Sequence, residues 1–517
     1  MKSQDPTVIP VNYKLLLAIL GMIGIGIILL ATNRYGAGLS PDSVGYVTTA
    51  RNIANGAGIV TYDGSPLVVQ PPLYPAILAI IDYVLRVDPL SSTNIVNAIL
   101  FGLIVYLGGM LTRKYLSSFP AFALVGTLAI VFSIPLFNVS VMAWSEPLFI
   151  CFVLLSLIFA HSYLEKKDIT SLMFFSSSVA LSSLTRYIGV TLIFLGVLII
   201  FVFHRDILKN RIAHLLLFAL ISALPLGLWL IRNYAVSSTF FGPRASSLYT
   251  LPQNLMLVFN ALMNWYIPGI IQDHRPTLIL FGAVLGFFIG LDPKGSWQRV
   301  KVILRKISPI VLFAIIYTTF LVISSTTTAY DIIDYRLLSP IYVPLTLLLL
   351  ILAQALVEPY RRRFSNKIIN SFLIIGLAIG LVYPIHATII NAVNFTSTGG
   401  GYSSKAWVES ETIQYLLQHK TLKSECTIYT NGTDVTNILA HLATKGIPAR
   451  TNYNSPDLVN DISKLRGSWP EESNACLVWF DTIKRTYLFT IDELQEIANI
   501  GLIARFKDGA IYSITRK

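Results

Sequence analysis

Long apolar runs separated by short polar segments make up the first three quarters of the chain. A helix needs about 20 predominantly apolar residues to cross the hydrocarbon core of a bilayer. The pattern therefore predicts a polytopic α-helical membrane protein with about 11 transmembrane helices. The predicted spans are Val11–Thr32, 95–112, 120–139, 148–164, 169–185, 187–203, 212–231, 276–291, 307–325, 337–357 and 368–386.

The apolar run Leu73–Val87 is short for a span and carries Asp82 and Arg86, so we predict an interfacial helix in the first outer loop, 33–94. If this run does not cross and the N-terminus is cytoplasmic, the cytoplasmic loops hold 18 of the 39 Lys and Arg residues and the outer loops hold 8. Positive charge is retained in the cytoplasm. The count therefore predicts that Asp42 and the C-terminus face the extracytoplasmic side.

The last part of the chain, 395–517, has the composition of a soluble domain and follows the junction Gly399-Gly-Gly-Tyr402. Strand-like runs alternate there with helix-like runs, which predicts a small extracytoplasmic α/β domain behind the transmembrane module 1–394. No glycine-rich phosphate-binding loop occurs in it. Cys426 and Cys476 each begin a predicted strand on an oxidising side, so a disulfide is possible and stays open at this point.

Composition supports the membrane assignment and limits the partners. The chain is 54% hydrophobic and 13% charged, whereas soluble domains are about a quarter charged. The formal net charge of +12 does not indicate nucleic-acid binding, because basic residues in a polytopic protein mainly hold loops in the cytoplasm. The first run, Val11–Thr32, lacks a small-residue cleavage site behind it and reads as a signal anchor. No Cys or His spacing typical of a metal site is present.

Charged residues gather at the predicted outer ends of the spans. The acids are Asp42, in the stretch Ser40–Gly58, and Glu146, in the loop 142–148. One arginine at a span end is explained by snorkelling, and one acid at a helix start by the helix dipole. Several arginines on the side where positive charge is disfavoured indicate a bound anion, because an Arg fork matches a phosphate. These arginines are Arg186, Arg232 and Arg336.

The order of short motifs along residues 10–410 resembles the GT-C superfamily of integral membrane glycosyltransferases. The branch that it resembles holds the protein O-mannosyltransferases and the aminoarabinose transferases of lipid A. The motifs are Asp42-Ser-x-x-Tyr46 with Arg51, Pro71-Pro-Leu-Tyr74, Trp144-Ser-Glu-Pro-Leu-Phe149, Leu184-Thr-Arg-Tyr-Ile-Gly189, Trp229-Leu-Ile-Arg-Asn233 and Asp334-Tyr-Arg-Leu-Leu-Ser-Pro340.

The resemblance implies transfer of a sugar from a polyprenyl-phosphate or dolichyl-phosphate donor to a lipid, glycan or protein acceptor at the outer face, with inversion and without a nucleotide. Asp42 would be the catalytic base, and Glu146 would orient the acceptor or bind a metal. The arginines Arg186, Arg232 and Arg336 would neutralise the departing lipid phosphate. Further candidates for substrate binding are Tyr46, Arg51, Gln70, Tyr74, Arg244 and Asp334.

Two departures from the family pattern leave the donor sugar open. Gln70 stands where the aminoarabinose transferases carry a lysine, and Ser43 stands where the mannosyltransferases carry a second acid. A divalent metal is possible, with Asp42 and Glu146 as oxygen ligands, although no spacing indicates one. Two other functions remain open: a secondary transporter for an anion, and a non-catalytic lipid-binding protein. The sequence shows no repeated halves, and its polar residues lie at span ends, which disfavours the transporter.

Overall fold

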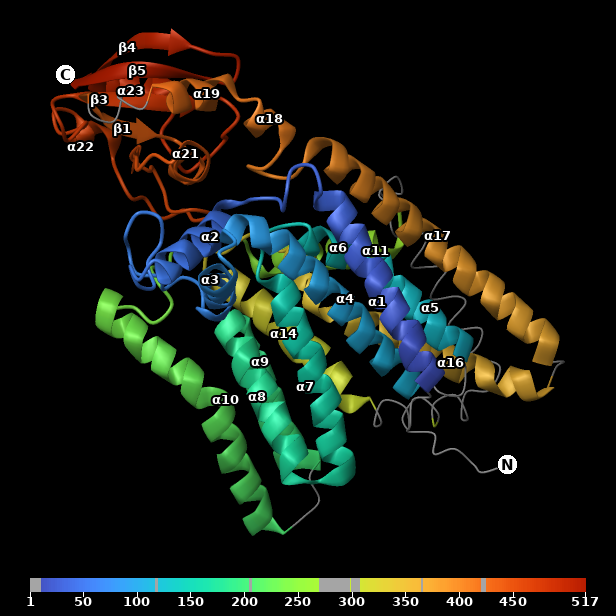
Figure 1. Ribbon diagram of the computed structural model, residues 1–517. Coiled ribbons are helices and arrows are strands. Elements are labelled where there is room, and N and C mark those ends of the chain that lie inside the picture. Colours follow the sequence, from blue (N-terminus) through green and yellow to red (C-terminus); the bar gives the residue numbers. More distant parts are fainter. Residues whose placement is uncertain are drawn as a thin grey trace.

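Apolar helices form the larger part of the molecule, and a mixed sheet forms the smaller part near the C-terminus (Figure 1). The structure is a computed structural model. It describes residues 11–116, 120–203, 207–268, 298, 307–363, 366–419 and 425–517.

The apolar part contains long helices and several short ones that bend or extend them. These elements are α1 (Val11–Thr32), α4 (Pro89–Tyr115), α5 (Pro120–Val131), α6 (Ile134–Ser140), α7 (Glu146–Lys166), α8 (Ile169–Thr185), the 3₁₀ turn η1 (Tyr187–Gly189), α9 (Val190–Leu198), the π turn η2 (Ile199–Phe203), α10 (Leu208–Ser237), α11 (Leu251–Tyr266), α14 (Ser308–Thr327), α15 (Tyr335–Leu338), η3 (Ser339–Ile341), α16 (Tyr342–Arg363) and α17 (Asn366–Thr398).

The protein is an integral membrane protein. Within the described residues, 8 helices are long and apolar enough to cross a bilayer, and each corresponds to a predicted span. Two further predicted spans form shorter apolar helices, Ile169–Thr185 and Tyr187–Phe203. The remaining predicted span, 276–291, lies outside the described residues. The structure thus confirms a polytopic helical protein and supports 8 of the 11 predicted spans by length.

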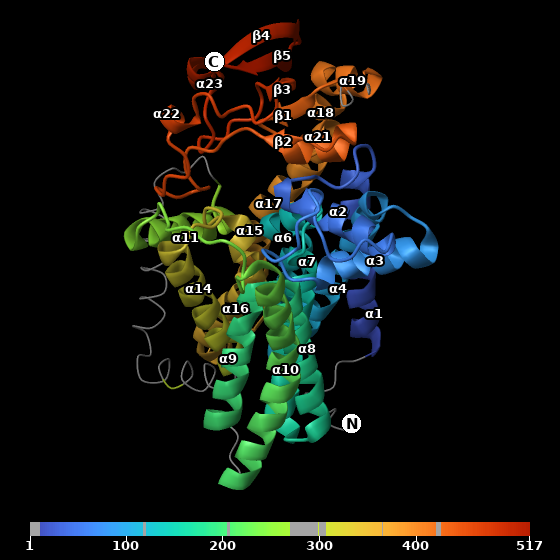
Figure 2. The same ribbon diagram turned by 90° about the vertical axis from the view of Figure 1, so that its left-hand side faces the viewer.

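Two helices of the first loop lie across the ends of the long helices, on the side of the sheet domain (Figures 1 and 2). Helix α2 (Pro41–Ala54) starts at Ser40, whose side chain exchanges capping hydrogen bonds with Ser43. Helix α3 (Leu73–Leu85) covers the predicted interfacial run. Its Tyr74 and Leu78 are buried, whereas its opposite face is exposed and apolar, as the bilayer interface requires.

The C-terminal part folds around a 5-stranded mixed sheet with the order β2-β1-β3-β5-β4. Strands β1, β2 and β3 are parallel, and β5 pairs antiparallel with β3 and β4. The expected α/β character is confirmed. The elements are α18 (Lys405–Val408), α19 (Glu411–Gln418), β1 (Thr427–Thr430), α21 (Thr433–Ala440), β2 (Lys445–Gly446), α22 (Ile462–Leu465), β3 (Ala475–Phe480), α23 (Ile491–Ile497), β4 (Ala498–Arg505) and β5 (Gly509–Arg516).

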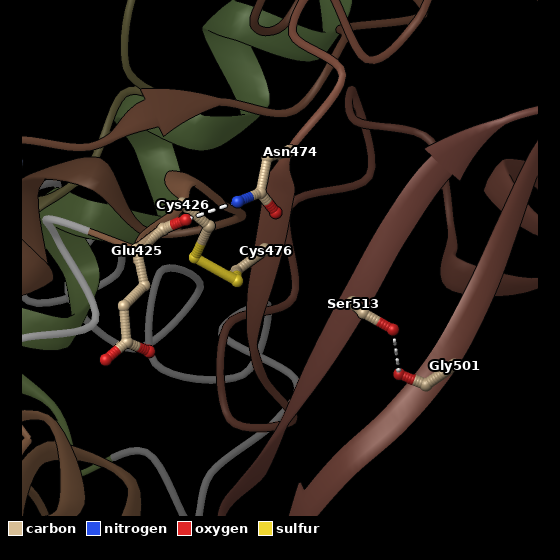
Figure 3. Close-up of a disulfide and its surroundings, with 6 residues drawn as sticks. All are labelled: Glu425, Cys426, Asn474, Cys476, Gly501 and Ser513. Carbon is tan, nitrogen blue, oxygen red and sulfur yellow. Dashed lines mark hydrogen bonds between the residues drawn. A yellow bond between two sulfur atoms is a disulfide. The ribbon is translucent and has the colours of Figure 1, made fainter.

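Alternation along β3 builds a core on each face of this sheet. Val478 and Phe480 pack with α19 and α21 on one face, while Leu477 packs with α23 on the other. Cys426 and Cys476 are joined in a disulfide on the first of these faces (Figure 3). The pairing that the sequence left open is therefore present in the structure.

The glycine junction ties the two parts of the chain together. The backbone N–H of Leu39 donates to Gly400 O, and that of Tyr402 donates to Leu39 O. Gly401 has φ +54°, and a Cβ there would lie 1.8 Å from the carbonyl oxygen of Leu39. Only glycine permits this approach. The segment that leads into α2 is thus held by the junction that leads into the sheet domain.

Candidate functional site

Arg336, in the short helix α15, lies between three carboxylates. Its Nε donates to Glu146 Oε1 at 2.5 Å, its Nη2 to Asp42 Oδ2 at 2.5 Å and its Nη1 to Asp331 Oδ2 at 3.1 Å. The guanidinium carbon also lies 4.2 Å from the ring centroid of Trp144. Only 9% of the side chain is exposed, so these partners replace its water shell.

Arg186 adds a second guanidinium to the same cluster. It follows α8 in extended backbone, and its Nη1 lies 2.5 Å from Glu146 Oε1 and 3.4 Å from Ser145 Oγ. Glu146 begins α7, and its side chain is 1% exposed. Its second oxygen, Oε2, is buried and has no hydrogen-bond partner in the described part of the chain. Glu146 thus bridges the two arginines through one oxygen and leaves the other unused.

Asp42 is partly accessible, with 35% of its side chain exposed, whereas Glu146 is 1% exposed and Asp331 is 44% exposed. Gln70 donates from Nε2 to its Oδ1 at 2.9 Å. Burial alone would raise the pKa of Asp42, but the charge and hydrogen bond of Arg336, with Arg186 behind it, hold that pKa below its usual value. Asp42 is therefore ionised at neutral pH and partly open to solvent.

Tyr46 and Tyr74 form the packed wall behind Asp42. The hydroxyl of Tyr46 lies 2.9 Å from Ser145 Oγ, and the two tyrosine rings meet edge to face at 5.2 Å. Tyr74 donates to Asn97 Oδ1 at 3.1 Å. Burial raises the pKa of Tyr46 far above its usual value, so its hydroxyl stays protonated. Both side chains are buried, and their predicted part in substrate binding stays a prediction.

The other sequence candidates bond or pack with the protein itself, and of these Asp334 lies beside Arg336. Arg51 pairs with Asp88 through two hydrogen bonds of 2.8 and 2.9 Å. Arg232 donates to the carbonyl oxygens of Leu67 and Ile59 in the first loop. Two others complete the set: Asp334 caps α15 by accepting from the N–H groups of Arg336 and Leu337, and Arg244 lies over the Tyr330 ring at 4.9 Å.

Sequence reasoning missed Trp144, Asp331 and Tyr453 as members of the site. Trp144 stood in the quoted motif next to Glu146, and its indole lies against Arg336. Asp331 stood in the polar segment before α15. Tyr453 comes from the C-terminal part and donates to Asp331 Oδ1 at 3.1 Å. No sequence pattern indicated that contact, because it joins residues far apart in the chain.

The described residues include no group of three or more His, Cys, Asp or Glu side chains that could hold a metal ion. Two cavities lie near the cluster. One of about 220 Å³ separates α2 from α21, and one of about 280 Å³ lies between α6 and the end of α17. Neither is lined by Asp42, Glu146, Arg186 or Arg336. The cluster is instead filled by its own ion pairs.

The fold over nearly the whole chain matches known membrane proteins. ArnT from Cupriavidus metallidurans in the apo state has a TM-score of 0.59 at 12% identity, covering 96% of this chain and 97% of that one. The same protein bound to undecaprenyl phosphate gives 0.58 at 13%, with 98% of each chain covered. The oligosaccharyltransferase AglB from Archaeoglobus fulgidus, in complex with an inhibitory peptide and a dolichol-phosphate, gives 0.54 at 13%, covering 91% of this chain and 69% of that one.

Over nearly the whole chain, the fold is the one that ArnT has. Residues 69–229 match the sequence family described as dolichyl-phosphate-mannose-protein mannosyltransferase. A search of curated protein sequences found no match. The expected resemblance and the expected enzyme class, glycosyltransferase, are confirmed. They favour the enzyme over the transporter.

Proposed function

We propose that the protein moves a sugar from a polyprenyl-phosphate donor to an acceptor, at the end of the helices that carries the sheet domain. The observation that carries this proposal is the meeting of Asp42, Glu146, Arg186 and Arg336 at one point. A base and a paired set of guanidiniums are the two parts that such a transfer needs. Support also comes from the family match over 69–229 and from the ArnT-like fold.

In this mechanism the acceptor hydroxyl gives its proton to Asp42 as its oxygen attacks the anomeric carbon. The bond from that carbon to the phosphate oxygen breaks, and polyprenyl phosphate leaves with the electron pair. Attack opposite to the leaving group inverts the anomeric configuration. Arg336 and Arg186 stabilise the negative charge that develops on the phosphate. Gln70 holds Oδ1 of Asp42, and Oδ2 can take the proton of the acceptor once Arg336, which holds it at 2.5 Å, turns part of its charge to the phosphate.

The ion pairs of the cluster also define what the donor must displace. Arg336 is shared by Asp42, Asp331 and Glu146. When a phosphate takes a guanidinium N–H, Asp42 loses part of the interaction that depresses its pKa. The carboxylate then becomes a stronger base at the moment the donor is bound. Donor binding and base activation are therefore coupled through one side chain.

The substrate classes follow from the same geometry. The site lies where the helices end, so a polyprenyl chain can stay in the bilayer while its phosphate reaches Arg336. The acceptor, a lipid, a glycan or a protein, approaches from the sheet domain, where Asp42 is exposed. On the predicted topology this side is extracytoplasmic. In this chemistry the guanidiniums of Arg186 and Arg336 supply positive charge to the phosphate, and a divalent metal stays a possible addition.

The direct test uses purified protein and a short-chain polyprenyl-phosphate sugar. The wild type should release free polyprenyl phosphate, and Asp42→Asn should slow the release about 100- to 10,000-fold, the usual contribution of a general base. Asp63→Asn is the matched control. Asp63 lies in the same loop and bonds Thr61 and Ser65, away from the cluster.

Two controls separate loss of chemistry from loss of fold. Asp42→Asn should retain the wild-type thermal transition in detergent to within a few degrees, because asparagine keeps the shape and the contact with Gln70. Turnover by Asp42→Asn at the wild-type rate would disprove the assignment of the base. Release by neither wild type nor control would favour the non-catalytic lipid-binding alternative.

A further inference from the structure

One loop of the sheet domain reaches the candidate site. This loop, 452–457, forms hydrogen bonds with two segments of the membrane part. Its Asn454 accepts from the N–H of Leu248 and donates from its side chain to Tyr330 O at 2.9 Å. Its Asp457 accepts from the backbone and hydroxyl of Ser246. The loop is therefore fixed over the residues that precede α15.

From this loop, Tyr453 extends to the carboxylate of Asp331. Its hydroxyl donates to Oδ1 at 3.1 Å, while Oδ2 of the same carboxylate accepts from Arg336 Nη1 at 3.1 Å. The Tyr453 side chain is itself half exposed, at 50%. Asp331 thus links the sheet domain to the central guanidinium, with one oxygen committed to each.

The position of Asp331 on Arg336 differs from that of the other two acids. Glu146 is buried beneath the guanidinium, and Asp42 is held on its other side by Gln70. Asp331 is 44% exposed, the most of the three acids, and it occupies Nη1 of Arg336. The carboxylate oxygen on that N–H takes the place that one phosphate oxygen would occupy, since both are anionic acceptors of a charge-assisted hydrogen bond from arginine.

We propose that Asp331 is a displaceable stand-in for the donor phosphate, and that Tyr453 of the sheet domain holds it in place. This inference rests on the proposed function of the site. While the donor is absent, Asp331 neutralises Arg336. When the phosphate arrives, Asp331 gives up Nη1 and keeps its bond to Tyr453. The two are positioning residues: they act on the donor through Arg336 and make no contact with the reacting atoms.

The charges around Asp331 weaken its hold on Arg336. The groups that face it are Asp42, Asp334, Arg336, Arg186 and Tyr453. Burial, followed by the charge of Asp42, raises the pKa of Asp331 despite the arginines. A carboxyl with a raised pKa is neutral below that pKa and ionised above it. As the pH rises through it, Asp331 competes more strongly for Arg336, so donor affinity should fall.

The test measures the affinity of a short-chain polyprenyl phosphate for the full-length protein, beside the turnover assay. Asp331→Asn should bind the lipid phosphate about three- to tenfold more tightly, the range expected for loss of one competing hydrogen bond from a partly solvated carboxylate. Tyr453→Phe should bind it about twofold more tightly, because Asp331 is less firmly held. Tyr487→Phe is the matched control. Its ring packs edge to face on Tyr453, but its hydroxyl does not contact Asp331.

A pH series from about pH 5 to about pH 8 adds a readout that a purely structural role would not change. The affinity of Asp331→Asn for the lipid phosphate, divided by that of the wild type, should increase as the pH rises. Because both proteins bind the same ligand, this ratio does not depend on the titration of the ligand. If the wild type is active and both Asp331→Asn and Tyr453→Phe bind the lipid phosphate equally or more weakly, the proposal that Asp331 is a stand-in is wrong. The proposed function is then unaffected. A wild type that binds no polyprenyl phosphate and releases none overturns this inference and the proposed function together.

Discussion

The guanidinium of Arg336 is largely buried and forms ion pairs with three carboxylates. A buried charge is tolerated only when its hydrogen bonds are satisfied. Here Asp42, Asp331 and Glu146 satisfy all three guanidinium nitrogens. The cluster is consequently a structural element of the apo protein as well as the site of the proposed chemistry. The stability of a variant in this cluster should therefore be measured before its activity is interpreted.

Glu146 is the residue where the structural share should be greatest. It is 1% exposed and neutralises both Arg186 and Arg336 through one oxygen. Glu146→Gln leaves two buried guanidiniums with too little negative charge. We expect a loss of about 3–5 kcal/mol, the range for breaking a buried ion pair. Thermal unfolding of the purified protein in detergent measures it as a clear drop in the transition temperature.

An exposed pair at the far end of the same helix is the control for Glu146. Glu165, 42% exposed, pairs with Lys114 and His161. Glu165→Gln should cost no more than about 1 kcal/mol, as surface ion pairs do. Equal shifts for Glu146→Gln and Glu165→Gln would contradict the view that Glu146 holds the cluster together.

At the scale of elements, the first loop is held in place by side chains that the sequence had suggested for substrate. Arg51 anchors the end of α2 to Asp88, the N-cap of α4. Arg232, on α10, donates to Leu67 O at 2.6 Å and to Ile59 O at 3.1 Å. Both arginines hold the loop that presents Asp42 and Gln70. We predict that they serve the proposed reaction by supporting the loop.

Arg232 allows a test of that distinction. Arg232→Gln removes the donors to two carbonyl oxygens of the loop, so protease cleavage between Tyr62 and Ser65 should become faster. Donor KM should change less than about threefold, because the guanidinium of Arg232 lies outside the cluster. Arg34→Gln is the matched control, since Arg34 is exposed and lies over Tyr35. A donor KM raised tenfold without faster cleavage would instead place Arg232 on the phosphate.

Helix starts in this chain are marked by signals that act over a few residues. Pro41 and the capping serines of α2, and Thr490 before α23, mark helix starts by chemistry that acts within four residues. The contacts of Arg336 with Asp42 and Glu146 cross 294 and 190 residues, and no local rule reaches that far. The topology argument could bring these residues to one side of the membrane. It could not show which arginine would meet which acid, because packing decides that.

The shorter helices show a second limit of the pattern. Hydropathy predicted spans at 169–185 and 187–203, and the structure forms apolar helices there that are too short to count as spans by length. The turn at Arg186 divides them and brings its guanidinium to Glu146. An apolar run in the sequence is equally consistent with burial in lipid and burial in protein. The residues that interrupt such a run can therefore be more informative about function than its length.

In the whole molecule, the site, the first loop and the sheet domain share one end of the helices (Figure 2). The other end carries the basic residues that close α4 and α7. The disulfide between Cys426 and Cys476 belongs to the sheet-domain end. Disulfides persist on the oxidising side of a membrane. This agrees with the direction given by the positive-inside count, and each argument rests on different residues.

Cysteine labelling can test this orientation with little background, because Cys426 and Cys476 are bonded and Cys151 is buried. Ser65 is exposed in the first loop, and Lys166 is exposed at the opposite end of α7. A membrane-impermeant maleimide on sealed cells should modify Ser65→Cys and leave Lys166→Cys unmodified until the membrane is opened with detergent. The reverse order would put Asp42 on the cytoplasmic side. The proposed transfer would then have to use donors that face the cytoplasm, and the disulfide would lie in a reducing compartment where it should not persist.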